Sequence, residues 1–423
     1  MSSSLDSSSI TKLILEAKEN AYREMGSVDA PPPPKSVQWP VTCEVKPGLE
    51  GAVASESKIG FVDGARGALV YRGYDIFDLC AHSSFEEVSY LLIHGELPNA
   101  SQLEEFTQNL RTRQQVLPVT AKLLKELPVR NLHPMTLLEA ATIGAHATDA
   151  VGKVSTGTET VDELRAAHRL IAQMMTATGM VARMRQDQEF VEPDPTLSHA
   201  ANLVYVLTGK KPDEATTRIM DICLILHADH GMNASTFTAM VVTSTLSDLY
   251  FAVSGGLASL KGPLHGGANE AVLYDLEEIG SPDNVDSWFE TARDRKRKVM
   301  GMGHRVYKAY DPRARVLKPL AKLFSTRDPK IDALFDTAEK LEAVVLEEMG
   351  REKKIFPNVD FYSGLVYKAM GIETAMFTPI FAVSRVSGWV ARCLEYRQNN
   401  RIFRPRGVYT GEINREYVPV ASR

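Results

Sequence analysis

The sequence predicts a mainly α-helical protein with one small β-hairpin near its N-terminus. Apolar residues recur at helical spacing through most of the 423 residues, which is typical of amphipathic and buried helices. An alternation of apolar and polar residues is clearest only at residues 57–72, around Asp63-Gly64, a sequence typical of hairpin turns. No internal repeat of fixed period appears, so a repeat architecture is not expected.

Residues 1–38 are expected to form a flexible N-terminal appendage outside the catalytic fold. Residues 2–9 are mostly serine, a composition typical of disordered segments. Apolar positions within residues 10–25 predict a weak helix with many charges. The prolines of residues 31–34 then predict a stiff linker. We expect an appendage of this kind to be dispensable for chemistry.

Beyond the hairpin, helix start and stop signals divide the chain into a series of helices. Pro134 and Asp213 are residues that typically begin a helix, and Gly209 typically ends one. Residues 234–254 are rich in Ala, Ser, Thr and Gly and predict one long, buried helix, because small residues let helix axes approach closely. The other predicted helices are 85–94, 101–114, 119–126, 134–150, 160–183, 196–208, 213–229, 268–279, 284–298, 312–325, 329–350, 360–370 and 378–398.

Composition and charge exclude several classes of protein. With 44% hydrophobic residues, 24% charged residues and a net charge of −5, the chain is typical of globular proteins and does not attract nucleic acid or membranes by bulk electrostatics. The most apolar region, 231–260, is too rich in Ser, Thr and Gly for a membrane span. The N-terminus resembles neither a secretory signal nor a mitochondrial presequence, so we predict a cytoplasmic location.

The cysteines Cys43, Cys80, Cys223 and Cys393 lie far apart, without a Cys-x-x-Cys pair. This spacing predicts neither a metal knuckle nor a dense disulfide framework. We therefore expect cysteines that belong to the hydrophobic core of a protein in a reducing compartment.

The most informative stretch of the sequence covers residues 301–313. Gly301 and Gly303 bracket His304, and glycines let a backbone turn sharply or approach a ligand closely. A histidine presented by such a turn is suited to proton transfer near neutral pH. An Asp-Pro-Arg sequence ending at Arg313 is expected to open the next helix and to present the guanidinium to a carboxylate or phosphate. The loop is therefore a candidate site for an anionic substrate beside a histidine.

A strongly cationic run, residues 293–298, lies just upstream of this loop. Such a run is most often a solvated helix face or helix end. It could also bind the phosphates of a polyanion that docks beside His304. The sequence alone leaves both interpretations open.

Three further segments carry groups suited to acid–base chemistry. His227 and His230 are three residues apart, so they share one side of a helix. His265 lies at the predicted N-terminus of helix 268–279, where the helix dipole disfavours the imidazolium. Asp360 opens another predicted helix among aromatic residues. Structural roles compete with these interpretations, because Asp360 could be a helix cap, His230 a core residue, and the His-x-x-His pair a metal site.

Taken in order, these four segments resemble the citrate synthase family over about residues 45–415. Gly-x-Gly-His followed by Asp-Pro-Arg at this spacing is the signature that carries the resemblance. Met302 stands where an aromatic residue is commoner, and Gly231 stands where many bacterial members carry an acidic residue. Neither departure removes a residue that carries the chemistry.

The resemblance implies a citrate-synthase-like two-domain helical fold. A large helical domain would comprise residues 39–266 and 373–423, and a small domain, residues 267–372, would carry the catalytic loops. The site would lie in the cleft between them, so closure of the small domain should exclude water before the reaction begins.

The resemblance also implies an acyltransferase of the tricarboxylic acid cycle that condenses acetyl-CoA with oxaloacetate and water to give citrate and CoA. Asp360 would remove a proton from the thioester methyl group, His265 would donate to the enolate oxygen, and His304 would protonate the oxaloacetate carbonyl. Arg404 is expected to reach the site of the neighbouring subunit in a homodimer. No cofactor and no metal are expected. By the same resemblance, oxaloacetate is held by His230, Arg313, Arg385 and Arg404, and the CoA-binding candidates are Arg297, Lys298 and Lys308.

Three alternatives remain open from the sequence. The nearest is 2-methylcitrate synthase, which uses propionyl-CoA, although the Arg-Pro-Arg at 404–406 and the His-Arg at 304–305 favour the citrate enzymes. A helical nucleic-acid-binding protein could use residues 293–298. A metal-dependent hydrolase could be built on His227, His230, His265 and Asp360.

Overall fold

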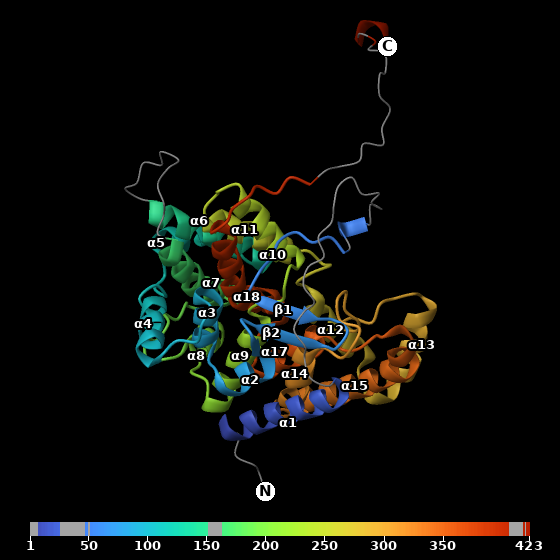
Figure 1. The fold of residues 1–423 in the computed structure, drawn as a ribbon. Helices are drawn as coiled ribbons and strands as arrows, with labels where there is room; N and C mark the ends of the chain where they lie inside the picture. Colours follow the sequence, from blue (N-terminus) through green and yellow to red (C-terminus); the bar gives the residue numbers. More distant parts are fainter. Residues whose placement is uncertain (1–6, 26–46, 50, 151–162, 406–417, 419) are drawn as a thin grey trace.

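The protein is mainly helical, as predicted, with a small antiparallel sheet formed by an early part of the chain (Figure 1). The computed structural model describes residues 7–25, 47–49, 51–150, 163–405, 418 and 420–423. Cys43 and the proline run at 31–34 lie outside these ranges. Within them, no helix is both long enough and apolar enough to cross a membrane.

The sheet contains three short strands in sequence order, paired antiparallel. They are β1 (Gly60–Asp63), β2 (Ala68–Tyr71) and β3 (Tyr74–Asp75). The first two form the predicted hairpin, and the carboxylate of Asp63 begins its turn by accepting the backbone N–H groups of Ala65 and Arg66 at 3.0 Å. The sequence pattern did not predict β3, because two residues are too few to show an alternation.

The helices that follow the sheet have bounds close to the predicted ones. They are α2 (Ile76–His82), α3 (Phe85–His94), α4 (Ala100–Arg111), α5 (Pro118–Lys125), α6 (Pro134–Ala150), α7 (Glu163–Arg185), α8 (His199–Thr208) and α9 (Glu214–His227). Gly209 ends α8 with a φ of 75°, and Asp213 caps α9, as predicted. Helix α2 was not predicted, because its seven residues are too few to show a helical period.

The prediction of a single helix over residues 234–254 is wrong. Two helices lie there and pack side by side, α10 (Ala234–Ser244) and α11 (Leu249–Leu260) (Figure 1). Leu246 has a φ of 68° and interrupts the helical path. The carboxylate of Asp248 then caps α11 by accepting the N–H groups of Tyr250 and Phe251. The many small residues therefore mark close packing between two helices, not one long helix.

The later part of the chain forms helices joined by short 3₁₀ and π turns. They are α12 (Ala268–Ile279), η2 (Pro282–Asn284), α13 (Val285–Asp294), α14 (Pro312–Ser325), α15 (Pro329–Val345), η3 (Leu346–Gly350), α16 (Arg351–Lys353), α17 (Val359–Ala369), η4 (Thr374–Met376), α18 (Phe377–Arg397) and η5 (Val420–Ser422). The predicted helix 284–298 ends early, so most of the cationic run lies in an exposed, irregular segment.

Helix α18 forms the centre of the hydrophobic core. It is buried from Phe377 to Cys393 and packs against α3, α7, α9, α10 and α11. Trp389 and Arg385 are among the largest fully buried side chains of the protein. The described cysteines Cys80 and Cys223 are also buried and free, like Cys393, which confirms the core assignment for these three.

The prediction of a separate appendage is wrong for its helical part, α1 (Ser7–Met25). This helix packs against α2, α9 and α14, with Ile10 and Ile14 fully buried. One of its charged residues, Glu24, forms an ion pair with Arg315 of α14. The many charges of α1 suggested a solvated segment, but the helix has one apolar face and docks it on the body.

Candidate active site

His304 is presented by the predicted turn between two glycines. Gly301 and Gly303 have φ values of 72° and 84°, in the left-handed region that favours glycine. A Cβ at Gly301 would lie 2.6 Å from the side chain of Val272 and 3.0 Å from the Cα of Phe361 in α17. Glycine therefore lets the His304 loop lie directly against the helix that carries Asp360.

Asn358 ties the His304 loop to the start of α17. Its backbone N–H donates to Gly301 O, and its side-chain amide donates to Gly303 O, both at 2.9 Å. Its Oδ1 accepts the N–H of Asp360 at 2.9 Å, which makes Asn358 the N-cap of the helix. One side chain thus connects the segments that carry His304 and Asp360.

The contacts of the His304 ring define its tautomer. Nδ1 accepts the backbone N–H groups of Val306 and Tyr307 at 3.0 and 3.2 Å. Because an amide N–H can only donate, the ring proton lies on Nε2, which is the nitrogen that can donate to a substrate. Burial, reinforced by the positive charge of Arg313, lowers the pKa of His304 to about 4. The ring is therefore a neutral donor at physiological pH.

His230 lies beside His304, with the two ring centroids 5.2 Å apart. Its Nε2 is 3.1 Å from the hydroxyl of Tyr307, a residue of the His304 loop. Burial and then the charge of Arg313 hold the pKa of His230 well below its ordinary value. The segment after α9 therefore brings a second neutral histidine to the loop.

His265 lies just before α12 and contacts the first turn of α10. The backbone N–H of Ser235 donates to its Nε2 at 3.3 Å, and the Ser235 hydroxyl lies 2.8 Å from the same nitrogen. The ring proton is therefore on Nδ1. Burial, followed by the charge of Arg385, lowers the pKa of His265 to about 4. His265 thus offers a neutral N–H donor, and burial is the main cause of its neutrality.

Asp360 is not the cap of its helix, because Asn358 has that role. Burial raises the pKa of Asp360 to about 6, although the charge of Arg313 acts in the opposite direction. Within the described part of the chain, no hydrogen bond or ion pair holds its carboxylate. A half-buried carboxylate with a raised pKa and no donor to weaken it is well suited to accept a proton.

Arg313 and Arg385 bring buried positive charge to the cluster formed by His230, His265, His304 and Asp360. Arg313 forks onto Asp311, with Nε–Oδ1 and Nη2–Oδ2 distances of 3.0 and 2.8 Å, so part of its bonding capacity is used within the protein. Arg385 donates from Nε to the His227 carbonyl at 2.6 Å, and its Cζ lies 4.6 Å from the ring centroid of Phe381. Burial lowers the pKa of Arg385 to about 10. Both arginines remain charged at neutral pH and can bind the carboxylates of a small anion.

Among the other predicted residues, the charge of Lys308 helps to lower the pKa of His304, whereas the described contacts of Arg297 and Arg404 lie elsewhere. Arg404 is exposed, and its guanidinium donates to the carbonyl of Pro405 at 3.3 Å. Arg297 forms ion pairs with two carboxylates of α12. Lys298 and Lys308 have exposed side chains. The cationic run is thus a helix end that is partly neutralised by ion pairs.

The residues that orient the candidate groups were not predicted from the sequence. These are Ser235 for His265, Tyr307 for His230, and Asn358 for the His304 loop. Each lies within seven residues of a group that the sequence analysis did name, such as His230, His304 or Asp360. Spacing alone could not find them, because it does not show which segments meet in space.

The metal-site alternative finds little support in the geometry. The Nδ1 of His227 lies 2.7 Å from the carbonyl of Cys223, one turn earlier in α9, and its ring packs on Phe381. Among the described residues, no group of three or more His, Cys, Asp or Glu side chains could hold a metal ion. His227 therefore belongs to the core below the site.

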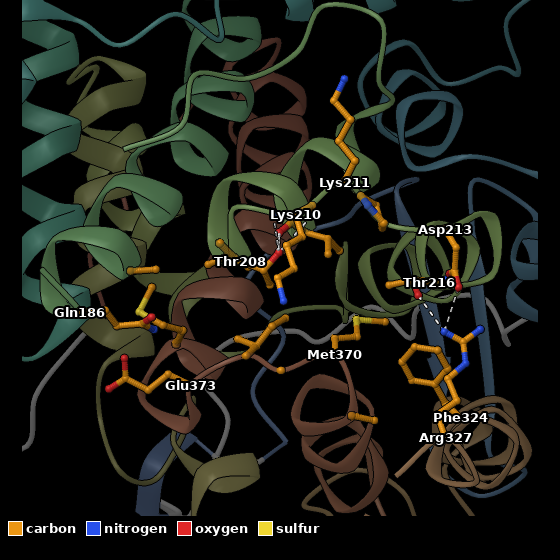
Figure 2. A pocket seen from close by; sticks show the side chains of 18 of the residues that line it. Gln186, Thr208, Lys210, Lys211, Asp213, Thr216, Phe324, Arg327, Met370 and Glu373 are labelled. Atoms are coloured by element: carbon orange, nitrogen blue, oxygen red, sulfur yellow. Dashed lines mark hydrogen bonds and ion pairs between the residues drawn. The ribbon is translucent and has the colours of Figure 1, made fainter. Parts of the chain in front are cut away.

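A cavity of about 490 Å³ lies apart from these residues, between the C-terminal ends of α7, α8, α14 and α17 (Figure 2). Lys210, Arg327, Met370 and Glu373 are among its lining residues, and Arg327 is held by Asp213 at 3.1 Å. None of the acid–base candidates lines it. The cavity is therefore not the candidate active site.

The sequence is similar to known citrate synthases over most of its length. The family model for the citrate synthase C-terminal domain matches residues 48–406. The citrate synthase of Acidithiobacillus ferridurans is 45% identical over 386 residues, which cover 89% of this chain and 98% of that protein. The citrate synthase of Haloferax volcanii is 42% identical over 386 residues, which cover 90% of this chain and 99% of that protein.

The fold is similar to those of solved citrate synthases. The crystal structure from Pyrobaculum aerophilum has a TM-score of 0.81 at 40% identity and covers 92% of this chain and 100% of that one. A ternary complex of carboxymethyl coenzyme A and oxaloacetate with the citrate synthase of Thermoplasma acidophilum has a TM-score of 0.84 at 34% identity. It covers 90% of this chain and 100% of that one.

Proposed function

The chain belongs to the citrate synthase family, and from this premise we propose how its residues perform the citrate synthase reaction. The proposal assigns acetyl-CoA and oxaloacetate as substrates and Asp360, His265 and His304 as the catalytic groups. One observation carries it: a carboxylate with a raised pKa and two neutral histidines, whose donating nitrogens are defined, are each influenced by the charge of the buried Arg313 or Arg385.

Asp360 begins the reaction by accepting a proton from the methyl group of the thioester. The electron pair left behind moves onto the thioester oxygen and forms an enolate, whose negative charge needs a donor. His265 supplies this donor through Nδ1–H, because Ser235 occupies Nε2. The buried surroundings strengthen both interactions, since charge is poorly screened there.

The enolate carbon then attacks the carbonyl carbon of oxaloacetate. The carbonyl oxygen gains negative charge, and His304 protonates it from Nε2, the nitrogen that its backbone contacts leave available. Arg313, Arg385 and His230 bind the carboxylates of oxaloacetate and so align its carbonyl with the enolate. Hydrolysis of the resulting thioester by water releases citrate and CoA.

A thiol-release assay with oxaloacetate tests the assignment of substrates. We expect CoA release that requires both substrates and a higher kcat/KM for acetyl-CoA than for propionyl-CoA. One methylene changes such a ratio by roughly 10–200-fold. A preference for propionyl-CoA would show a 2-methylcitrate synthase instead, and thioester hydrolysis without oxaloacetate would contradict a condensing enzyme.

The acid side of the pH profile should report the ionisation of Asp360. Burial raises the pKa of Asp360 to about 6, and the base must be ionised, so activity should fall as pH decreases through this value. His265 and His304, with pKa values of about 4, remain neutral in this range. We expect kcat/KM for acetyl-CoA, measured at saturating oxaloacetate, to fall about tenfold per pH unit well below pH 6. A flat profile down to about pH 5 would exclude Asp360 as the base.

We propose that the protein is a homodimer and that Arg404 completes the site of the partner subunit. The segment that carries Arg404 is anchored to the end of α10, where Asn400 Nδ2 donates to Ser244 O at 3.0 Å and Phe403 N–H donates to Ser244 Oγ at 3.2 Å. Apolar side chains are exposed nearby, since Leu246 between α10 and α11 is 69% exposed and Ile402, two residues before Arg404, is 64% exposed. Exposed apolar surface of this kind is typical of a protein–protein interface.

Mixing two inactive variants tests the proposed exchange of Arg404. Arg404→Ala and Asp360→Asn should each be nearly inactive when pure, because each lacks one group in every site. In a mixed dimer, one site receives both an intact Arg404 and an intact Asp360. We expect mixing under subunit exchange to restore up to about a quarter of the parental activity at a 1:1 ratio, since half of the dimers are mixed and each has one complete site. If mixing restores nothing while exchange is demonstrated, Arg404 acts within its own chain.

We also keep the predicted domain division as a proposal. Helices α12, α14, α15 and α17 pack against one another, which supports a small domain over residues 267–372, and residues 39–266 with 373–423 would form the large domain. The exposed side chains of Lys298 and Lys308 remain candidates for the phosphates of CoA, and so does Arg297 if its ion pairs with Asp275 and Glu278 open. The cytoplasmic location stays a prediction.

A further inference from the structure

A buried ion pair lies directly behind His230. The guanidinium of Arg392, from α18, forks onto the carboxylate of Asp229 with Nε–Oδ1 and Nη2–Oδ2 distances of 2.7 Å each. The Asp229 side chain is fully buried and that of Arg392 is 3% exposed. Burying a pair of charges costs desolvation free energy, so such a pair often adds little to the stability of the folded protein. Its position beside a residue proposed to bind substrate suggests a role other than stability.

The ion pair fixes the backbone on both sides of His230. The Oδ2 of Asp229 accepts the N–H of Gly231 at 3.1 Å. The carbonyl of Asp229 accepts the hydroxyl of Tyr71 at 2.7 Å. Gly231 has a φ of 60°, so the chain turns sharply there. Asp229 is thus held by its side chain and its backbone, and it holds the residue that follows His230.

The strand β1 leaves room for this arrangement by means of one glycine. A Cβ at Gly60 would lie 2.5 Å from Asp229 Oδ2 and 3.3 Å from Arg392 Nη2. Arg392 is further held by Ser57, whose hydroxyl lies 3.1 Å from Nη1. The pair is therefore enclosed by the sheet on one side and α18 on the other, with little freedom to move.

We propose that Arg392 is a positioning residue for oxaloacetate: through Asp229 it sets the position of the His230 ring against Tyr307 and His304. This inference rests on the proposed role of His230 in binding oxaloacetate. The negative charge of Asp229 also offsets the positive charges of Arg392 and Arg385, both of which act on His230. Loss of Arg392 should therefore loosen the His230 turn and weaken oxaloacetate binding more than it slows the chemical step.

The test measures oxaloacetate binding and turnover separately in the full-length protein. Arg392→Gln should raise the Kd for oxaloacetate in calorimetry and its KM by about tenfold or more, because a displaced binding group loses alignment. The same variant should lower kcat by less than about threefold. Arg392→Lys retains the charge but cannot form both hydrogen bonds to Asp229. Its Kd and KM for oxaloacetate should therefore lie between those of Arg392→Gln and the parent. Gly60→Ala should raise the Kd in the same way, because its Cβ displaces Asp229 while the arginine at position 392 is retained.

Arg169→Gln provides the matched control. Arg169 of α7 pairs at 2.9 Å with the buried carboxylate of Asp149 of α6, which also pairs with Arg165 at 3.4 Å, so this change removes one arginine from a buried ion-pair group outside the site. It should lower the melting temperature without changing the Kd for oxaloacetate. If Arg392→Gln melts at a lower temperature but keeps the parental Kd and KM for oxaloacetate, the ion pair is only structural and the proposal is wrong. If Arg392→Gln does not fold, the same result for Arg392→Lys and Gly60→Ala would lead to the same conclusion. If the parent itself does not bind oxaloacetate, the proposed function fails instead.

Discussion

Asp360→Asn should nearly abolish citrate formation while the protein stays folded. Asparagine preserves the shape of the side chain but cannot accept the methyl proton, and the loss of a general base typically lowers the rate by about 10²–10⁴-fold. Burial raises the pKa of Asp360 above its ordinary value, so the folded state disfavours the ionised carboxylate at neutral pH. The neutral amide removes this unfavourable ionisation, and we expect an unchanged or higher melting temperature at neutral pH.

The measurement for this variant combines steady-state kinetics with proton exchange. Exchange of the acetyl-CoA methyl protons into deuterated solvent reports the first step directly, and it should be lost together with turnover. The matched control is Asp328→Asn, the same change at an aspartate that does cap a helix by accepting the N–H of Lys330 at 2.8 Å. This control should keep the parental activity. Turnover of Asp360→Asn within a few-fold of the parent would show that another group is the base.

The sequence predicted the fold class because its helical signals are local. Caps such as Asp213, stops such as Gly209 and the periodic apolar residues between them depend only on neighbours in the chain, and the structure places those helix ends where they were expected. Two wrong predictions, the single helix over residues 234–254 and the separate N-terminal appendage, have the same cause. The break at Leu246 and the docking of α1 both depend on tertiary packing, which composition does not report.

The candidate site could be predicted only in part, for a similar reason. Short motifs identify His265, His304 and Asp360 as residues suited to chemistry, but they do not show which nitrogen of a histidine carries the proton. That depends on the N–H of Ser235, which only the folded chain brings to His265, and on the exact turn that directs the N–H of Val306 to the ring of His304. The sequence also suggested that Asp360 could be a cap, whereas the structure gives that role to the residue two positions earlier.

Arg313 illustrates a further limit of sequence reasoning. Its position in the first turn of α14 was predicted correctly, and so was its ability to fork onto a carboxylate. The sequence could not show that this carboxylate is the neighbouring Asp311, which occupies Nε and Nη2 in the structure. Asp311 uses two of the five guanidinium N–H groups, so the three that remain, on Nη1 and Nη2, are the ones that can bind a substrate carboxylate.

His265→Ala should have the second-largest effect on the reaction. The change removes the Nδ1–H donor and leaves the enolate oxygen without its proposed partner. Removal of one such donor typically lowers kcat by about 10²–10³-fold. The side chain supports little of the core, because His265 is only half-buried between Gly262 and α12. We therefore expect near-parental melting and oxaloacetate binding, with loss of methyl-proton exchange as well as turnover.

Ser235→Ala is the control that separates the donor from its orientation. The change removes the hydroxyl near Nε2 of His265 but keeps the backbone N–H of residue 235. This N–H still donates to Nε2 of His265 and so keeps the ring proton on Nδ1. We expect only a few-fold decrease in kcat for this variant. The acid side of the pH profile should stay at the pKa of Asp360, about 6, because neither change alters the base. If His265→Ala exchanges methyl protons at the parental rate but forms no citrate, His265 acts after enolisation, and the donor to the enolate must be sought elsewhere in the cluster.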